Sequence, residues 1–442
     1  MLPRIQISRR NPHLLETADG RQFLFIADTA WELFHRTYLD EAREYLSTRA
    51  EQRFNMIWAN VLAEFDGIRT PNVYGNRPFV DEDPLQPNEG YFEYVDNVIG
   101  LATERGLYVG LLPTWGDKLT SPWGDGPALF RMDNLNVAYE YAKWLGSRYA
   151  FHDNVLWVLG GDRPAKLFGP ENEFPRAYAK HVGLPMEVDW TPIWRALAHG
   201  LRAGGAQQLI TYHPQGGSVS SSVFLHNEPW LQINAIQSGH GDGHDAPNWD
   251  LIARDYAMQP TKPTFEAEPN YEDHPVSPWP KWDPQNGRFD DYDVRKQLYR
   301  SIFAGGCGVV YGHHSIWQFA SDRYPGINHV LMGWKTALHR PGAEQVRHLR
   351  TLTDDFDLLA STPAPSLLSP EPSPSKHACA LRSPNRWMIY FPVAAEAILP
   401  LEQFSGRPFR LERFDPVSGL IGDWNAPLST ERDAVAVLTL LD

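Results

Sequence analysis

The stretch that decides the fold is Pro263-Thr-Phe-Glu-Ala-Glu-Pro-Asn-Tyr-Glu272, and its counterpart is Asn154-Val-Leu-Trp-Val-Leu-Gly-Gly-Asp-Arg-Pro164. Each begins as a short apolar run typical of a buried strand and ends at a carboxylate beside Gly or Pro. In a parallel barrel, functional side chains stand where a packed strand passes into a loop. An N-cap or a loop ion pair explains either acid alone equally well. Two such acids after two different strands favour Asp162 and Glu268 as working groups.

Working outward from these stretches, short apolar runs alternate with segments of helical periodicity. Strands are predicted at residues 23–27, 55–61, 107–112, 155–159, 208–212, 231–236, 263–267 and 308–311. Helices are predicted at residues 39–54, 91–105, 133–149, 189–203, 247–258 and 291–303. Strands separated by helical segments are typical of the α/β class, and this pattern predicts a (β/α)8 TIM barrel.

The texture of the sequence changes after about residue 357. Residues 361–375 contain five Pro and five Ser, which end the helical periodicity. Short alternating runs follow at residues 378–383, 386–392, 409–415 and 434–441. We therefore predict a catalytic barrel over residues 1–357 and a small all-β sandwich domain over residues 358–442. That domain either binds carbohydrate or packs against the barrel, and the lack of a clear aromatic cluster favours packing.

Composition excludes several classes of protein. The formal net charge of -14 disfavours a nucleic-acid binder, which needs a basic face for phosphate. The two cysteines, Cys307 and Cys379, imply neither a disulfide framework nor a cysteine-based zinc site. No apolar run is long enough to span a bilayer, and residues 1–15 lack the apolar core of a signal peptide. We expect a cytoplasmic protein without a membrane partner; a trimmed leader would make it periplasmic or secreted. The oligomeric state stays open.

The predicted strand ends supply a set of polar and aromatic side chains for one face of the barrel. Aromatic residues make up 12% of the chain, which suits the stacking of sugar rings, although most such residues serve as core. A carbohydrate is therefore the expected partner. The candidate substrate-binding residues are Asp28, Trp31, Asn60, Trp115, His213, Gln237, His240, Tyr271, His313 and Trp317.

Two carboxyl groups are what the hydrolysis of a glycosidic bond requires. One protonates the leaving oxygen, and the other meets the oxocarbenium-like centre or activates a water. Carboxyl groups about 5–5.5 Å apart indicate a retaining mechanism with a covalent intermediate, and about 6.5–9.5 Å indicates inversion. Asp162 and Glu268, after the fourth and seventh predicted strands, would face each other across the barrel mouth.

Several of these residues are also compatible with other roles. His240 and His244 are metal ligands by type, but their Gly-rich loop sets no ligand spacing, so a metal is not expected and sugar contact is favoured. His213 is equally compatible with a structural role, and Trp31, Trp115 and Trp317 with core packing. No nucleophile elbow and no phosphate-cradling turn occur, and no cofactor is expected. The main alternative to an enzyme is a catalytically inactive barrel that binds carbohydrate or serves as a scaffold.

Four motifs carry a resemblance to a known family. They are Asp28-Thr-Ala-Trp31, Asn72-Val-Tyr-Gly-Asn-Arg-Pro-Phe79, Trp157-Val-Leu-Gly-Gly-Asp162 and Glu268-Pro-Asn-Tyr-Glu272. Together they resemble the apiosidase-like glycoside hydrolases, family 140, over roughly residues 10–355, with the small C-terminal β-domain that often follows.

The resemblance implies a retaining enzyme that cleaves a plant-derived glycoside or oligosaccharide. The acid/base of the family falls on Asp162 and its nucleophile on Glu268. Glu266 is a rival for the nucleophile, because alternation along the strand places it on the same face as Glu268.

Overall fold

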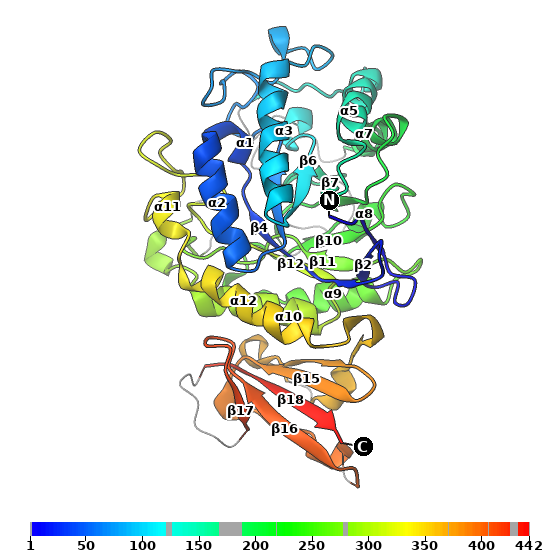
Figure 1. Cartoon of the computed structure of the whole chain (residues 1–442), viewed down its shortest axis with the longest axis vertical. Coiled ribbons are helices and arrows are strands. Elements are labelled where there is room, and N and C mark those ends of the chain that lie inside the picture. Colours follow the sequence, from blue (N-terminus) through cyan, green and yellow to red (C-terminus); the bar gives the residue numbers. More distant parts are fainter. Residues whose placement is uncertain are drawn as a thin grey trace.

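The computed structural model of the chain describes residues 2–120, 126–167, 188–217, 219–276, 282–369, 371–404, 406–424 and 432–441. Within these ranges, eight parallel strands curl into the predicted barrel (Figure 1). They are β4 (Phe25–Thr29), β5 (Met56–Asn60), β6 (Tyr108–Leu112), β7 (Val155–Gly160), β8 (Ile210–His213), β10 (Asn234–Gln237), β11 (Thr264–Glu266) and β12 (Gly308–Tyr311).

The barrel closes between β8 and β10. Thr211 and Ile233 form an isolated parallel bridge there, and the N–H of Gln232 donates to the carbonyl of Ile210. An antiparallel strand, β9 (Val219–Ser220), adds to β10 beside this seam. The strands therefore form a nearly continuous ring, and the ends that carry the candidate residues all open on one side of it.

Helices cover the outside of the ring. The six predicted helices are present as α2 (Leu39–Glu51), α3 (Glu89–Glu104), α5 (Leu135–Tyr149), α7 (Thr191–Ala203), α9 (Asn248–Tyr256) and α10 (Asp291–Phe303). Further helices that the sequence pattern did not predict are α1 (Leu33–Arg36), α4 (Asp117–Thr120), α8 (Ser222–Leu225), α11 (Trp334–Ala337) and α12 (Pro341–Asp354). A small antiparallel sheet near the N-terminus was not predicted either; it contains β1 (Ile5–Ile7), β2 (Leu15–Thr17) and β3 (Gln22–Phe23).

Side chains alternate between two apolar clusters along β5. Met56 and Trp58 belong to one cluster, and Ile57 and Ala59 belong to the other. The neighbouring strand makes room for the indole of Trp58, since a Cβ on Gly110 would lie 2.7 Å from it. Strands buried on both faces explain why the sequence shows continuous apolar runs rather than alternation.

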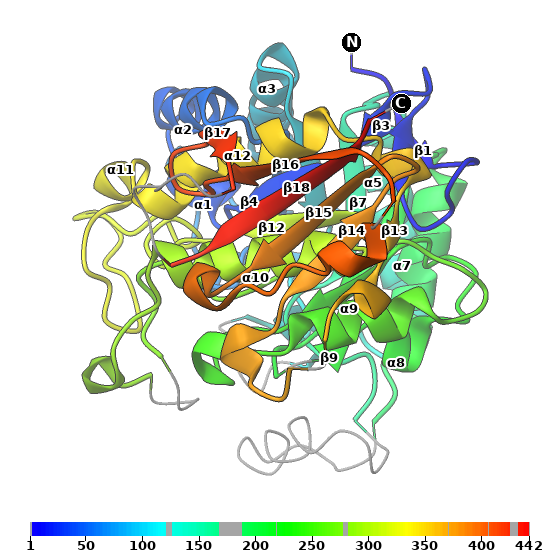
Figure 2. The same ribbon diagram turned by 90° about the horizontal axis from the view of Figure 1, so that it is seen from below.

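The C-terminal part is an antiparallel sheet on the opposite side of α10 and α12 from the barrel (Figures 1 and 2). Its described strands, in spatial order, are β13 (Thr362–Pro363), β14 (Cys379–Arg382), β15 (Arg386–Phe391), β18 (Ala434–Leu440), β16 (Phe409–Phe414) and β17 (Ile421–Asp423). The predicted fold class, a barrel followed by a small all-β domain, is confirmed. One face of this sheet packs on α10 instead of on a second sheet, because Met388 and Tyr390 share a core with Leu298 and Ile302.

No helix in the described ranges is both long and apolar enough to cross a membrane.

A buried ion pair joins the barrel to its helical shell. The Arg49 Nε of α2 lies 2.5 Å from Asp28 Oδ2 of β4, and the Tyr45 hydroxyl donates to the same oxygen at 2.6 Å. Both charged side chains are fully buried. Burial raises the pKa of Asp28, while the charge of Arg49 and the hydrogen bond from Tyr45 act in the opposite direction.

Replacing Arg49 by Met is therefore expected to lower the free energy of unfolding by about 3–5 kcal/mol, because it leaves a buried carboxylate without its cation. Urea denaturation of both proteins measures this loss. A matched control is Arg131→Met, which removes an exposed ion pair with Asp133 and should leave stability almost unchanged. Equal losses in the two variants would contradict a special role for the buried pair.

Candidate active site

Asp162 and Glu268 are brought together at one imidazole. Asp162 follows β7, Glu268 follows β11, and His213 ends β8. The backbone N–H of Asp162 donates to His213 Nδ1 at 3.2 Å, and His213 Nε2 lies 3.3 Å from Glu268 Oε2. The two acids, more than a hundred residues apart in the sequence, thus flank the two nitrogens of the same ring.

Two glycines before Asp162 make the sharp turn that places it there. Gly160 and Gly161 have φ angles of +92° and +100°, and a Cβ on Gly160 would lie 2.2 Å from the carbonyl of His213. Asp162 itself has a φ of 51°, a left-handed conformation that Asp tolerates better than most residues. The Gly-Gly-Asp sequence therefore provides the backbone geometry that directs the Asp162 N–H at His213.

The carboxyl group of Asp162 is partly enclosed by donors. Gln237 Nε2 donates to Oδ1 at 3.1 Å, and the N–H of Gly216 donates to the same oxygen at 3.3 Å. Arg163 Nη1 lies 3.4 Å from Oδ2. Burial raises the pKa of Asp162 and the charge of Glu268 raises it further, against the lowering effect of Arg163. Asp162 is thus biased toward the protonated form that a general acid needs.

Glu268 lies in the opposite electrostatic setting. Its two oxygens face His213 Nε2 and His240 Nε2, each at 3.3 Å. Burial by itself would raise the pKa of Glu268, but the hydrogen bonds and charges of the two imidazoles outweigh burial and lower the pKa to about 2. Glu268 is therefore an ionised carboxylate throughout the neutral range.

The hydrogen bonds also define the tautomers of both imidazoles. His213 Nδ1 accepts the N–H of Asp162, and His240 Nδ1 accepts the N–H of Tyr271 at 3.4 Å. An accepting nitrogen carries no proton, so the single proton of each neutral ring lies on Nε2. The Nε2 atom of each ring lies 3.3 Å from a Glu268 oxygen, so the carboxylate stands between the two imidazoles.

Glu266, the rival of Glu268, is placed differently. Its carboxylate is fully buried and accepts the N–H groups of Ser238 at 3.2 Å and of Glu268 at 3.3 Å. Burial raises its pKa to about 7, although these hydrogen bonds lower it. Glu266 holds the backbone on which Glu268 is carried, so the geometry favours Glu268 as the reacting carboxylate.

Aromatic rings surround His213. Trp31 packs on Trp115 at 5.1 Å and meets the His213 ring edge-on at 5.2 Å, and the Trp58 ring lies 5.9 Å from that of His213. Among the described residues, the Nε1 of Trp115 and both polar side-chain atoms of Asn60 are buried without a hydrogen-bond partner. Unpaired buried donors and acceptors at a barrel mouth are available to a bound polar ligand.

Two further predicted substrate-binding residues, Tyr271 and Trp317, pack on other aromatic rings. Tyr271 packs on His240 with ring centroids 4.6 Å apart, and its hydroxyl donates to Thr29 Oγ1 at 3.3 Å. Trp317 stacks on Phe65 at 5.7 Å, so it belongs to a second aromatic pair.

Two predicted contact residues are tied into structural networks. Asp28 is held in the buried ion pair with Arg49. The His313 ring is buried, with Nδ1 accepting the N–H of Ser315 and Nε2 lying 3.0 Å from Asp273. Asp28 Oδ2 and both ring nitrogens of His313 therefore contact internal partners, and a substrate contact of these two residues stays a prediction.

Arg163 was missed by the sequence reasoning. Its side chain is buried, and it lies between Asp162 and Glu64, 3.8 Å from the Glu64 carboxylate. Burial raises the pKa of Glu64 to about 8, against the charge of Arg163. The available signal was position, since Arg163 directly follows the acid in Gly-Gly-Asp-Arg-Pro.

The histidines of the Gly-rich loop do not converge on a common point. His240 faces Glu268, whereas His244 Nδ1 lies 2.9 Å from Asp293. In the described part of the chain, no group of three His, Cys, Asp or Glu side chains is placed to hold a metal ion. The arrangement at the barrel mouth is that of one acid biased toward protonation beside one ionised carboxylate.

Comparison with known proteins shows the family of the chain. Residues 9–360 match the family model described as the apiosidase-like catalytic domain. A solved glycoside hydrolase is similar at 26% identity and a TM-score of 0.82, with 99% of this chain and 97% of the other covered. A family 5 glycoside hydrolase from Bacteroides vulgatus shares the fold at 24% identity and a TM-score of 0.81, with 99% and 94% covered. A search of curated proteins found no match.

Proposed function

Because the chain belongs to the apiosidase-like glycoside hydrolases, we propose that it cleaves an O-glycosidic bond of a plant-derived glycoside or oligosaccharide with retention of anomeric configuration. Glu268 is the nucleophile and Asp162 is the general acid and base. The substrate class follows the family resemblance, with a furanoside such as an apioside as the first choice.

One observation carries the proposal. His213 accepts the backbone N–H of Asp162 and lies beside the Glu268 carboxylate, and the surroundings move the pKa values of the two acids in opposite directions, with that of Glu268 lowered to about 2 and that of Asp162 raised. Two neighbouring carboxyl groups with separated pKa values can act at the same pH as one acid and one carboxylate. Two equally exposed acids would both be ionised at neutral pH, and neither could act as the general acid.

The proposed reaction has two steps. A Glu268 oxygen bonds to the anomeric carbon as the glycosidic bond breaks, and Asp162 transfers its proton to the leaving oxygen. The Asp162 carboxylate then takes a proton from water, whose oxygen bonds to the anomeric carbon and releases Glu268. The second step returns Asp162 to its protonated form.

Buried polar groups near the pair support a polar substrate. Gln237 holds Asp162 through Nε2, while its Oε1 has no partner among the described residues. Asn60 and the Nε1 of Trp115 are also without partners there. Sugar hydroxyl groups both donate and accept hydrogen bonds, so a saccharide can satisfy these atoms where an apolar ligand cannot.

The stereochemistry of transfer tests this proposal. A panel of aryl furanosides and pyranosides, including an apiofuranoside, is incubated with the protein in aqueous methanol. A retaining enzyme should give a methyl glycoside with the anomeric configuration of the substrate, measured by proton NMR. A product of opposite configuration contradicts the double displacement. Absence of turnover on the whole panel, with saccharides still bound, favours the inactive binding barrel.

A further inference from the structure

The loop that carries His240 is hydrogen-bonded to Glu268 and to Asn270, two residues further along the chain. Residues 238–246 run from the end of β10 to α9 and include the short 3-10 helix η2 (Gly243–Asp245). Asn270 Nδ2 donates to the carbonyl of Gly239 at 2.8 Å and to that of Gly243 at 3.4 Å. The N–H of Gly239 donates to the carbonyl of Glu268 at 2.8 Å. The position of His240 therefore depends on how this loop is held.

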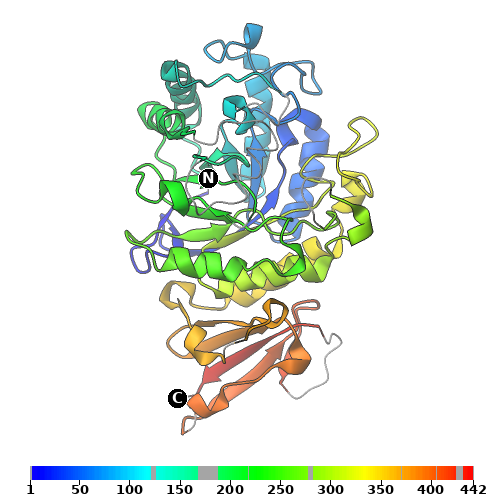
Figure 3. The same ribbon diagram turned by 180° about the vertical axis from the view of Figure 1, so that it is seen from behind.

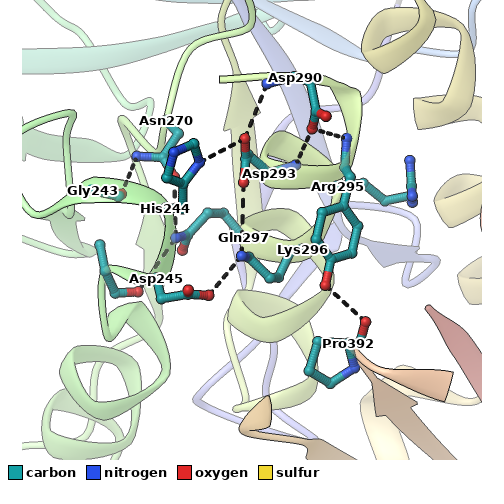
Figure 4. A network of polar contacts seen from close by, with 12 residues as sticks. Gly243, His244, Asp245, Asn270, Asp290, Asp293, Arg295, Lys296, Gln297 and Pro392 are labelled. Atoms are coloured by element: carbon teal, nitrogen blue, oxygen red, sulfur yellow. Dashed lines mark hydrogen bonds and ion pairs between the residues drawn. The ribbon is translucent and has the colours of Figure 1, made fainter. Parts of the chain in front are cut away.

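One face of helix α10 holds the same loop (Figure 4). Lys296 Nζ donates to Asp245 Oδ1 at 2.6 Å, and Gln297 Nε2 donates to Asn270 Oδ1 at 3.3 Å. His244 contacts Asp293, as described above, and the Asp293 carboxylate also accepts the N–H of Asp290 at the start of the helix. Positions 293, 296, 297 and 300 recur every three or four residues, so they form one stripe along the helix.

The same helix holds the C-terminal sheet domain. Arg295 makes a bidentate pair with Asp433, at 2.9 and 2.8 Å, and the Tyr292 hydroxyl donates to the carbonyl of Pro392 at 2.8 Å. Figure 3 shows this helix between the barrel and the sheet. The contact is also apolar, because Tyr299 stacks on Tyr390 at 5.0 Å inside a continuous core. A close-packed contact of this kind leaves the helix little freedom to rotate or slide.

Arg300 joins the two sets of contacts. Nη1 lies 3.4 Å from Asp245 in the loop. Nε donates to the carbonyl of His377 at 3.1 Å, and Nη2 donates to that of Pro374 at 2.6 Å, both in the segment before β14. The side chain is fully buried and lies over the Trp249 ring at 4.6 Å. One rigid guanidinium thus binds the loop and the C-terminal segment at the same time.

We propose that the C-terminal sheet domain, acting through α10, positions residues 238–246 and so keeps His240 against Glu268. Asp245, Lys296 and Arg300 are positioning residues, and none of them reaches the reacting atoms. The catalytic consequence rests on the proposed function, whereas the mechanical link does not. The C-terminal domain is then a working part of the active-site scaffold and not an independent carbohydrate-binding appendage.

Hydrogen exchange of the full-length protein tests the link without any substrate. Arg300→Lys keeps the charge, but a single ammonium cannot hold Asp245 and two carbonyl groups in the same geometry. We expect amide exchange in peptides covering residues 238–246 to accelerate at least about tenfold, while β5 and β6 exchange at the original rate. Wild-type exchange rates in this loop would overturn the proposal.

Arg49→Lys is the matched control, because it alters a buried ion pair of the barrel that does not touch the loop. Its loop exchange should stay at the wild-type rate. If both variants accelerate loop exchange equally, the cause is general loss of stability and the proposal is wrong.

Tyr292→Phe keeps the test decisive if Arg300→Lys does not fold. It removes only the hydroxyl that bonds Pro392, leaving the ring that Lys296 overlies at 5.0 Å. Losing one hydrogen bond should accelerate loop exchange about twofold to tenfold. If amide exchange in the loop is not accelerated, the proposal that the C-terminal domain positions the loop is wrong.

Activity supplies the second measurement. In Arg300→Lys, kcat/KM should fall about tenfold to a hundredfold if the loop misplaces His240. Faster loop exchange with unchanged kcat/KM would overturn the positioning of Glu268. If the wild-type protein hydrolyses no glycoside, the proposed function fails, and the exchange data still decide the link between domain and loop.

Discussion

Replacing Glu268 by Ala is expected to lower kcat/KM on an activated aryl glycoside by about a thousandfold or more, the scale of loss when a covalent nucleophile is removed. The Glu268 carboxylate is the only side chain in the proposal that bonds to the anomeric carbon. Glu268→Gln should be as damaging, since its amide NH2 would meet one of the two Nε2–H groups that now face carboxylate oxygens. The measurement is steady-state kinetics on a dinitrophenyl glycoside.

Sodium azide separates loss of the nucleophile from loss of the fold. In Glu268→Ala, azide can enter the space of the missing carboxylate and attack the anomeric carbon, which should restore turnover and give a glycosyl azide of inverted configuration. The matched variant is Glu266→Ala, which removes the carboxylate at the buried rival position in the same way. Azide rescue at residue 266 and not at residue 268 would reverse the assignment.

Much of the barrel could be predicted from the sequence, because a strand buried on both faces leaves a continuous apolar run. The acids after β7 and β11 could be located because each follows such a run directly. The small N-terminal sheet was missed, since strands of two or three residues carry too little periodicity to stand out. Helix α12 was also missed; it lies beside α10 between the barrel and the C-terminal sheet.

The direction of side chains at the site was harder to predict from the sequence than their position at strand ends. Asp28 and His313 stand at strand ends like Glu268, yet Asp28 Oδ2 and both ring nitrogens of His313 contact internal partners. Only tertiary structure shows that Arg49, from α2, reaches back to Asp28. The pairing of His213 with both acids was equally hidden, because it depends on a left-handed Asp162 that turns its N–H toward the ring. Strand ends therefore predict which residues lie at the barrel mouth. Partners that are distant in the sequence decide which of these side chains remain available to a substrate.

The role of the C-terminal domain shows the same limit. Its alternating runs predicted the strands, and β14, β15 and β18 proved to carry buried apolar side chains on both faces. The sequence favoured packing over carbohydrate binding, but it did not show that α10 would be the surface packed against. The contacts of Arg295 and Arg300 join residues 74 to 138 positions apart, so no local pattern reveals them.

Asp162→Asn is expected to reduce kcat/KM by an amount that depends on the leaving group. A glycoside with an alkyl leaving group needs protonation of the departing oxygen, so the loss should be about 10²–10⁴-fold. A dinitrophenolate leaves without a proton, so cleavage of the dinitrophenyl glycoside should slow far less. Steady-state kinetics across a series of leaving groups measures the difference. Equal losses for all leaving groups would contradict a general acid at Asp162.

The pH dependence of kcat/KM supplies a second sign of the same role. The active form has Glu268 ionised and Asp162 protonated. Because the pKa of Glu268 is about 2, its ionisation does not limit activity in the neutral range. The pKa of Asp162 is raised, so activity should fall as the pH rises through that value. Asp162→Asn has no proton to lose, and its residual activity on the dinitrophenyl glycoside should lack this alkaline decline.

Glu64 is the group that could imitate this decline. Burial raises its pKa to about 8, and it lies beside Arg163, which also contacts Asp162. If the alkaline decline persists in Asp162→Asn and disappears in Glu64→Gln, then Glu64 carries the catalytic proton. If Glu64→Gln retains the decline while Asp162→Asn loses it, the proton belongs to Asp162. The two variants thus assign the acid by its titration and not by its position at a strand end.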